Sequence, residues 1–205
     1  MSNNNNNICK RLKKEELYKA KWIALNQLTF SDPNGKERLW ETVDRTTRVG
    51  EVDGVDIIAL VTKEDQKKYI VLTVQYRPPV DAMVIEFPAG LIDQDETAEQ
   101  AAIRELKEET GYTGERVDSI SSILALEPGL SSANAQICTI NVMYTFPHPS
   151  IAKPKQHLED GEFIEVIVVP LNNLLDTLQN LTKKYHKCII DAKVYTFALG
   201  MSIKV

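Results

Sequence analysis

Residues 90–112 read GLIDQDETAEQAAIRELKEETGY, and this stretch decides the fold prediction for the 205-residue chain. Thr97 followed three residues later by Gln100 is the pattern of a capping box. The alanines, leucine and lysine that follow favour a helix, and Gly111 suits a left-handed helix C-cap. We therefore predict a helix over residues 97–110.

Three glutamates gather on one turn of this predicted helix, namely Glu105, Glu108 and Glu109. At 100° per residue their side chains span an arc of roughly 100°, and we expect them to point away from the buried stripe of Ile103 and Leu106. Like charges at this spacing repel each other, whereas Mg²⁺ binds carboxylate oxygens together with substrate phosphates. The cluster indicates half of a metal site that a phosphorylated substrate completes; a solvated acidic helix face is the alternative.

The segment before the helix favours the metal site. Residues 84–87 are typical of a short strand and residues 88–91 of a tight loop, in which Gly90 permits a close backbone approach. A loop carbonyl can then face the same cation as the glutamates. Arg104 lies next to Glu108 on the helix surface and is expected to hold it by a charged hydrogen bond.

Gly90, Glu96 and the run 104–112, RELKEETGY, resemble the Nudix box and match it at every fixed position. The similarity extends over roughly Trp22 to the C-terminus and indicates the ADP-ribose (ADP-sugar) pyrophosphatase branch of the Nudix hydrolase family. The segments that carry it are 75–79, 86–93, 127–131, 161–163 and 191–195.

The chain divides into three predicted regions: an Asn-rich disordered tail at 1–9, a β region at 10–53 for dimerisation and adenine binding, and a Nudix hydrolase domain at 54–205. From residue 55 onward, strand patterns alternate with helix patterns, which predicts an α/β (α+β) fold, an α/β/α sandwich around a mixed sheet with a small N-terminal antiparallel β-sheet region. The predicted strands are 22–30, 37–46, 57–61, 69–76, 84–87, 119–125, 135–146 and 163–169, with a hairpin turn at 31–35. The predicted helices are 12–19, 97–110, 171–185 and 191–201.

The resemblance implies a Mg²⁺-dependent enzyme, with Mn²⁺ as an alternative, that hydrolyses the pyrophosphate bond of ADP-ribose and related ADP-sugars to AMP and ribose 5-phosphate. The implied metal ligands are the carbonyl of Ala89 and the carboxylates of Glu105, Glu109 and Glu162. Glu108 is counted with Glu162 as catalytic, either as a ligand or as a carboxylate held by an arginine.

Glu162 is implied to be the general base, placed outside the box on a movable loop. The preceding stretch, 147–160, is rich in Pro, Lys and His, as a lid can be. Glu159 and Glu165 are nearby alternatives for the base, and a plain loop carboxylate is a further interpretation of Glu162. Glu96 is expected to be structural, tying the loop to the helix.

Seven residues are implied to bind a nucleotide-sugar substrate: Trp22, Trp40, Glu41, Arg45, Arg77, Leu91 and Glu127. The two tryptophans would sandwich the adenine, one from each subunit of a homodimer with shared active sites, and such stacking contributes roughly 1–3 kcal/mol per base. Packing in a core or an interface is their alternative role. Glu41 would accept a hydrogen bond from the adenine amino group.

The two arginines of this set would contact phosphates through their guanidinium forks, with surface salt bridges as the alternative. Leu91 and Glu127 would touch the terminal sugar.

Composition excludes several other classes of protein. The net charge of −5 argues against a nucleic-acid partner, and the apolar runs are too short to span a membrane. The three cysteines and three histidines show no metal-ligand or catalytic spacing. With no signal-peptide pattern after the asparagine run, we expect a cytoplasmic protein, and a nuclear presence stays open.

Three rival functions stay open at this stage. The first is hydrolysis of another nucleotide, such as an oxidised nucleoside diphosphate, coenzyme A or an RNA cap. The second is a non-catalytic ADP-ribose-binding module on the same fold, which would be expected to have lost glutamates of the box. The third is synthesis in reverse, which makes ATP from ADP-ribose and pyrophosphate.

Overall fold

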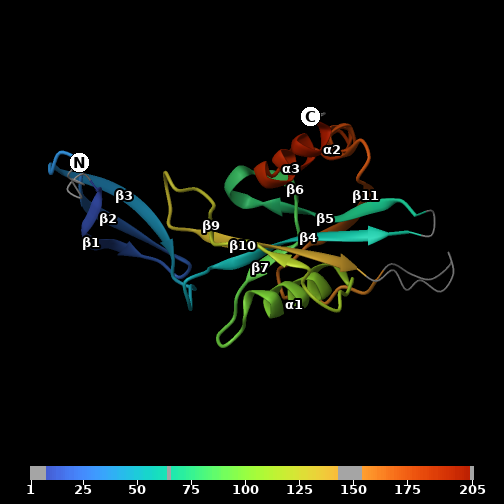
Figure 1. Cartoon of the computed structure of the whole chain (residues 1–205), viewed down its shortest axis with the longest axis horizontal. Helices are drawn as coiled ribbons and strands as arrows, with labels where there is room; N and C mark the ends of the chain where they lie inside the picture. The colour runs from blue at the N-terminus through green and yellow to red at the C-terminus, as the bar shows by residue number, and fades with distance from the viewer. Residues whose placement is uncertain (1–7, 64–65, 143–153, 204–205) are drawn as a thin grey trace, which may run out of the picture. The chain divides into compact units, whose positions relative to one another are not determined.

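The computed structural model describes residues 8–63, 66–142 and 154–203 (Figure 1). The chain folds into two compact units. Unit 1 comprises Met1–Asp53 with Ile123–Ala135, and unit 2 comprises Gly54–Ser122 with Gln136–Val205. The predicted Asn-rich tail lies almost entirely outside the described residues.

Unit 1 is built on a three-stranded antiparallel sheet in the order β1–β2–β3. Its strands are β1 (Lys10–Lys19), β2 (Ile23–Ser31) and β3 (Glu37–Arg45). The predicted strands near 22–30 and 37–46 are confirmed, as is the turn between them. In that turn Asp32 accepts backbone hydrogen bonds, and Gly35 has φ +78°.

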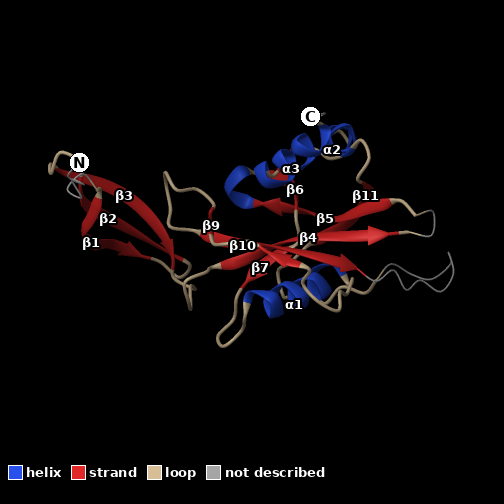
Figure 2. Cartoon of the chain, viewed as in Figure 1, coloured by secondary structure: helices blue, strands red, loops and turns tan. Residues whose placement is uncertain are grey.

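The predicted helix at 12–19 is wrong, because these residues belong to β1 (Figure 2). β1 pairs with β2 from Lys10 opposite Ser31 to Lys19 opposite Ala24, with two register shifts along the way. Leucine, lysine and glutamate favour a helix in isolation. Here the cross-strand hydrogen bonds of the long hairpin override that local preference.

The second segment of unit 1, residues 123–135, forms hydrogen bonds within itself and with β3. Within it β9 (Leu124–Ala125) pairs with the first residues of β10 (Asn134–Val142). Val43 of β3 donates its backbone N–H to Leu130 and accepts one from Ser132. Residues 119–125, predicted as one strand, instead form two short pieces, β8 (Ser119–Ile120) and β9.

Unit 2 is a mixed sheet covered by helices on both faces (Figure 2). The sheet runs β12–β6–β5–β4–β10–β8, with β11 paired to β5 and β7 paired to β4. Only the β12–β6 pairing is parallel among these described pairs. The remaining strands are β4 (Gly54–Thr62), β5 (Lys68–Arg77), β6 (Ala82–Glu86), β7 (Ala89–Leu91), β11 (Ile164–Pro170) and β12 (Cys188–Ile190).

The helices of unit 2 are α1 (Ala98–Thr110), α2 (Leu174–Thr182) and α3 (Ala192–Ser202), with a short 3₁₀ turn at Pro78–Val80. α1 buries Leu106 against the face of the sheet that carries Ile57 and Ile140. α2 and α3 bury Leu178 and Val194 against the opposite face. The predicted α/β/α sandwich is therefore confirmed, and so are its three helices. The last residues of the strand predicted at 135–146, namely 143–146, lie outside the described residues.

Among the described residues, no helix is both long enough and apolar enough to span a lipid bilayer.

Candidate active site

α1 begins and ends as the sequence predicts. Thr97 Oγ1 accepts a hydrogen bond from Gln100 N at 3.3 Å, and Gln100 Oε1 accepts one from Thr97 N at 2.8 Å. At the other end Gly111 has φ +73° and donates its N–H to Lys107. The capping box and the glycine set the length of the helix, and with it the turn on which the glutamates lie.

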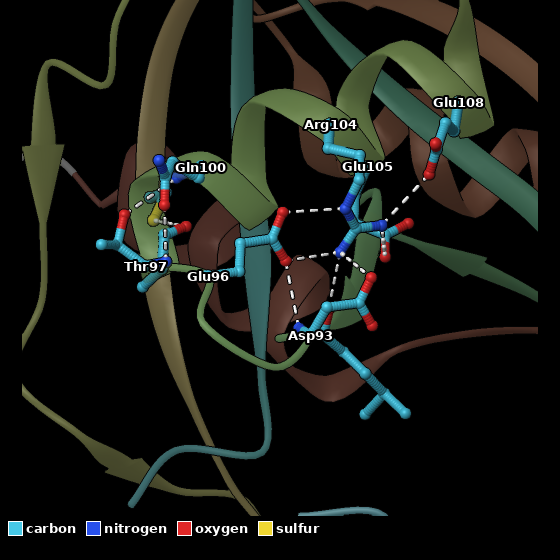
Figure 3. Close-up of polar contacts among 10 residues, drawn as sticks. Asp93, Glu96, Thr97, Gln100, Arg104, Glu105 and Glu108 are labelled. Carbon is cyan, nitrogen blue, oxygen red and sulfur yellow. Dashed lines mark hydrogen bonds and ion pairs between the residues drawn. The ribbon is translucent and has the colours of Figure 1, made fainter. Parts of the chain in front are cut away.

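Arg104 is the centre of the polar cluster on α1 (Figure 3). Its guanidinium group donates to both carboxylate oxygens of Glu96, at 2.9 and 2.8 Å. It also donates to Glu105 at 2.7 Å and to Glu108 at 3.1 Å. These partners raise the pKa of Arg104, so it stays charged.

The predictions for Glu96 and for the Arg104–Glu108 contact therefore agree with the structure. Glu96 Oε2 also accepts a hydrogen bond from Asp93 N at 3.1 Å, which ties the loop before the helix to the helix itself.

Residues 88–91, predicted as a tight loop, instead contain the short strand β7, which pairs with β4, and this segment lies directly against the glutamates. Ala89 N donates to Glu109 Oε2 at 3.0 Å. A Cβ atom on Gly90 would lie 1.9 Å from Cδ of Glu105, so any other residue at this position would displace the Glu105 carboxylate. Antiparallel pairing with β4 holds β7 in place, with Asp56 opposite Ala89.

One part of the helix prediction is wrong. The glutamates were expected to point away from the buried face, and Glu108 does, with 39% of its side chain exposed. Glu109 is only 4% exposed. Ala89 of β7 lies against its carboxylate, and a helical wheel contains no such neighbour from another element.

Burial changes the pKa values of Glu105 and Glu109. It raises the pKa of Glu109 to about 8; the hydrogen bond from Ala89 lowers that pKa, and the charges of Glu105 and Glu162 raise it. Burial also raises the pKa of Glu105, against the lowering effect of Arg104. A buried and a half-buried carboxylate whose pKa values are both raised by burial fit the binding of a divalent cation.

The ligand assignment stays a prediction. Within the described residues, no three His, Cys, Asp or Glu side chains converge as a preformed metal site. Glu105 is turned toward Arg104, and Glu109 toward Ala89 N.

Glu162 comes close to these glutamates from a distant part of the chain, since its charge raises the pKa of both Glu105 and Glu109. It lies half-buried in a turn in which Gly161 has φ +91°. Glu162 Oε2 accepts a hydrogen bond from Glu159 N at 2.9 Å, and Glu162 N donates to Glu159 O at 3.1 Å. The proposed lid is described only from Pro154 onward.

Two predicted substrate residues also belong to unit 2. Arg77 forms an ion pair with Glu86 at 2.9 Å while remaining 45% exposed, and its charge acts on Glu109. The salt-bridge alternative for Arg77 is thus realised in the free protein, and phosphate contact stays a prediction. Leu91 accepts a hydrogen bond from Arg104 Nη2 through its carbonyl at 2.9 Å.

Unit 1 carries the other predicted substrate residues, Trp22, Trp40, Glu41, Arg45 and Glu127. Trp22 is 60% exposed and Trp40 is 49% exposed. Trp40 meets Phe30 edge to face at 6.5 Å, and Lys21 lies over the Trp22 ring. Neither tryptophan is buried in the chain itself, so base stacking and an interface are the roles that stay open.

Two residues that the sequence did not single out, Gln156 and His157, contact the last turn of α1. Gln156 Nε2 donates to Glu109 O at 2.6 Å, and His157 N donates to Glu108 O at 2.8 Å. The predicted helix end indicated that such contacts must exist, because the last four carbonyls of a helix have no hydrogen-bond donors within the helix. Which residues supply them depends on the tertiary fold.

Comparisons with known proteins agree with the resemblance drawn from residues 90–112. A family model described as the NUDIX domain matches residues 52–191. An ADP-sugar pyrophosphatase of Mus musculus is 39% identical over 188 residues, which cover 91% of this chain and 84% of that protein. An ADP-ribose pyrophosphatase of Saccharomyces cerevisiae is 42% identical over 189 residues, 91% of this chain and 80% of that protein. The solved structure of an ADP compounds hydrolase, 19% identical, has the same fold with a TM-score of 0.64 over 94% of this chain and 91% of that chain.

Proposed function

Because this chain belongs to the Nudix family, we propose that it hydrolyses the pyrophosphate bond of ADP-ribose and related ADP-sugars to AMP and a sugar phosphate. The observation that carries the proposal is the pair of inner glutamates, buried Glu109 and half-buried Glu105, which lie against the segment 88–91. The names of relatives about 40% identical over most of the chain support the substrate class.

The residues fit a hard divalent cation, Mg²⁺ or Mn²⁺. The carboxylates of Glu105 and Glu109 and the carbonyl of Ala89 would hold it, with Glu162 as a further carboxylate. When bound, the ion neutralises charge that develops on the pyrophosphate oxygens. Arg104 donates hydrogen bonds to Glu105 and Glu108 and so orients both carboxylates for this task.

Glu162 acts as the general base in this proposal. It accepts a proton from the attacking water, and its hydrogen bond from Glu159 N holds the carboxylate in place. Arg77 would contact a phosphate of the substrate, while Glu86 holds its guanidinium group in position between turnovers.

The partner of unit 1 is a second copy of the chain. The three-stranded sheet and the turn between β1 and β2 expose large apolar side chains, among them Leu17, Tyr18, Trp22, Leu39 and Trp40. A sheet of this size needs packing on one face for stability, and clustered exposed apolar groups mark interaction surfaces. Light scattering at micromolar concentration should give the mass of a dimer; a monomer mass would remove the shared-site model. The cytoplasmic location stays a prediction.

Hydrolysis of ADP-ribose in the presence of Mg²⁺, followed by chromatography of AMP, tests the proposed function. Glu109→Gln should abolish turnover. Glu99→Gln, the same substitution at an exposed position of the same helix, should not. Turnover of another nucleotide but not of ADP-ribose would overturn the substrate assignment. Tight ADP-ribose binding without turnover would indicate a binding module.

A further inference from the structure

The end of α1 is capped by a segment far along the chain. The last carbonyls of a helix have no partner within it. Here Glu108 O accepts a hydrogen bond from His157 N, and Glu109 O accepts one from the side-chain amide of Gln156. The contact is close, since a Cβ on Gly111 would lie 2.6 Å from the carbonyl carbon of Pro154.

The same amide makes a second bond that reaches the other side of the loop. Gln156 Nε2 also donates to Ile164 O at 2.9 Å, and Ile164 is the first residue of β11. The loop that carries Glu162 lies between these two points. One side chain therefore closes the base of this loop and binds it to the helical turn of the metal-site glutamates.

Among the residues that the structure describes, the hydrogen bonds of Glu162 are local ones. Its backbone N–H and its carboxylate both bond to Glu159, across the turn at Gly161. These bonds fix the shape of the turn, whereas the bonds of Gln156 fix its position relative to α1. A catalytic group must keep its position closely, because a displacement of about 1 Å can cost on the order of 100-fold in rate.

We propose that Gln156 is a positioning residue, which acts through Glu162 by holding the Glu162 loop against the C-terminal turn of α1. The inference rests on the proposed function, in which Glu162 is the base. An amide suits the task because its nitrogen offers two protons to two carbonyl oxygens. A carboxylate at this position would offer none.

A double-mutant cycle tests the inference. Gln156→Ala should lower kcat for ADP-ribose by roughly 10–100-fold and leave KM nearly unchanged. In the Glu162→Gln background the same substitution should change kcat by less than about twofold, because the group that it positions is already lost. Gln136→Ala is the matched control, since that amide also bonds a carbonyl in unit 2, Ser121 O at 2.8 Å.

Each outcome decides the inference. Equal effects of Gln156→Ala in both backgrounds would show a merely structural role and overturn it, as would an unchanged kcat. If Gln156→Ala does not fold, Gln156→Asn replaces it, because that shorter amide keeps its donors but cannot bridge both carbonyls. Normal turnover by a Glu162→Gln variant would show that Glu162 is not the general base, and the positioning role of Gln156 would then be refuted as well. A wild-type protein without ADP-ribose hydrolysis would instead refute the proposed function.

Discussion

Glu109→Gln in the metal-free protein offers a direct test of the buried carboxylate. The side chain is 4% exposed and accepts a hydrogen bond from Ala89 N at 3.0 Å. A glutamine oxygen can accept the same bond in nearly the same volume. The substitution therefore removes the charge and leaves the packing in place.

The size and sign of the effect follow from the pKa of Glu109, which burial raises from its ordinary 4.5 to about 8. The folded state holds this proton more tightly than the unfolded state. The associated stability is complete below about pH 4.5 and is lost as the pH rises through about 8. At about 1.4 kcal/mol per pKa unit, the loss approaches at most about 5 kcal/mol by pH 9.

Urea unfolding at pH 4.5 and pH 9 in a chelator measures the effect. Variant and wild type should agree within about 1 kcal/mol at pH 4.5, and the variant should be the more stable at pH 9. Other titrating groups are common to both proteins and cancel in the difference. Mg²⁺ at pH 9 should stabilise the wild type far more than the variant. A stability difference that does not change with pH would refute the reasoning.

Three further predictions follow from single contacts. Gly90→Ala should weaken Mn²⁺ binding in calorimetry at least about tenfold, because the new methyl group displaces Glu105; unchanged affinity would place the metal elsewhere. Thr97→Ala should cost about 1 kcal/mol in urea unfolding through the lost N-cap, and no loss would contradict the capping box. Arg77→Lys should raise KM for ADP-ribose about tenfold, because lysine lacks the guanidinium fork, yet change stability by less than about 1 kcal/mol, because the ion pair with Glu86 is partly exposed. An unchanged KM would leave Arg77 a surface ion pair.

The active-site helix could be predicted from the sequence because its determinants are local. Thr97 and Gln100 are three residues apart, Arg104 and Glu108 are four apart, and Gly111 follows the last helical residue. Contacts at this spacing form in almost any context that allows a helix. The alternation of strand and helix patterns likewise predicted the layers of unit 2.

Residues 12–19 show where local preference fails. Their composition favours a helix, yet they form β1 because β2 lies alongside and supplies the hydrogen bonds of a strand. That outcome depends on the pairing of a whole hairpin and not on a window of a few residues.

What the sequence alone determined was the helix that carries the glutamates, its caps and the family resemblance, since all three depend on residues close together in the chain. Only the tertiary structure decided that Glu109 is buried, that Glu162 approaches it, and that Gln156 joins the Glu162 loop to α1. Burial and hydrogen bonds of this kind depend on which distant segments meet, and no local pattern encodes that meeting.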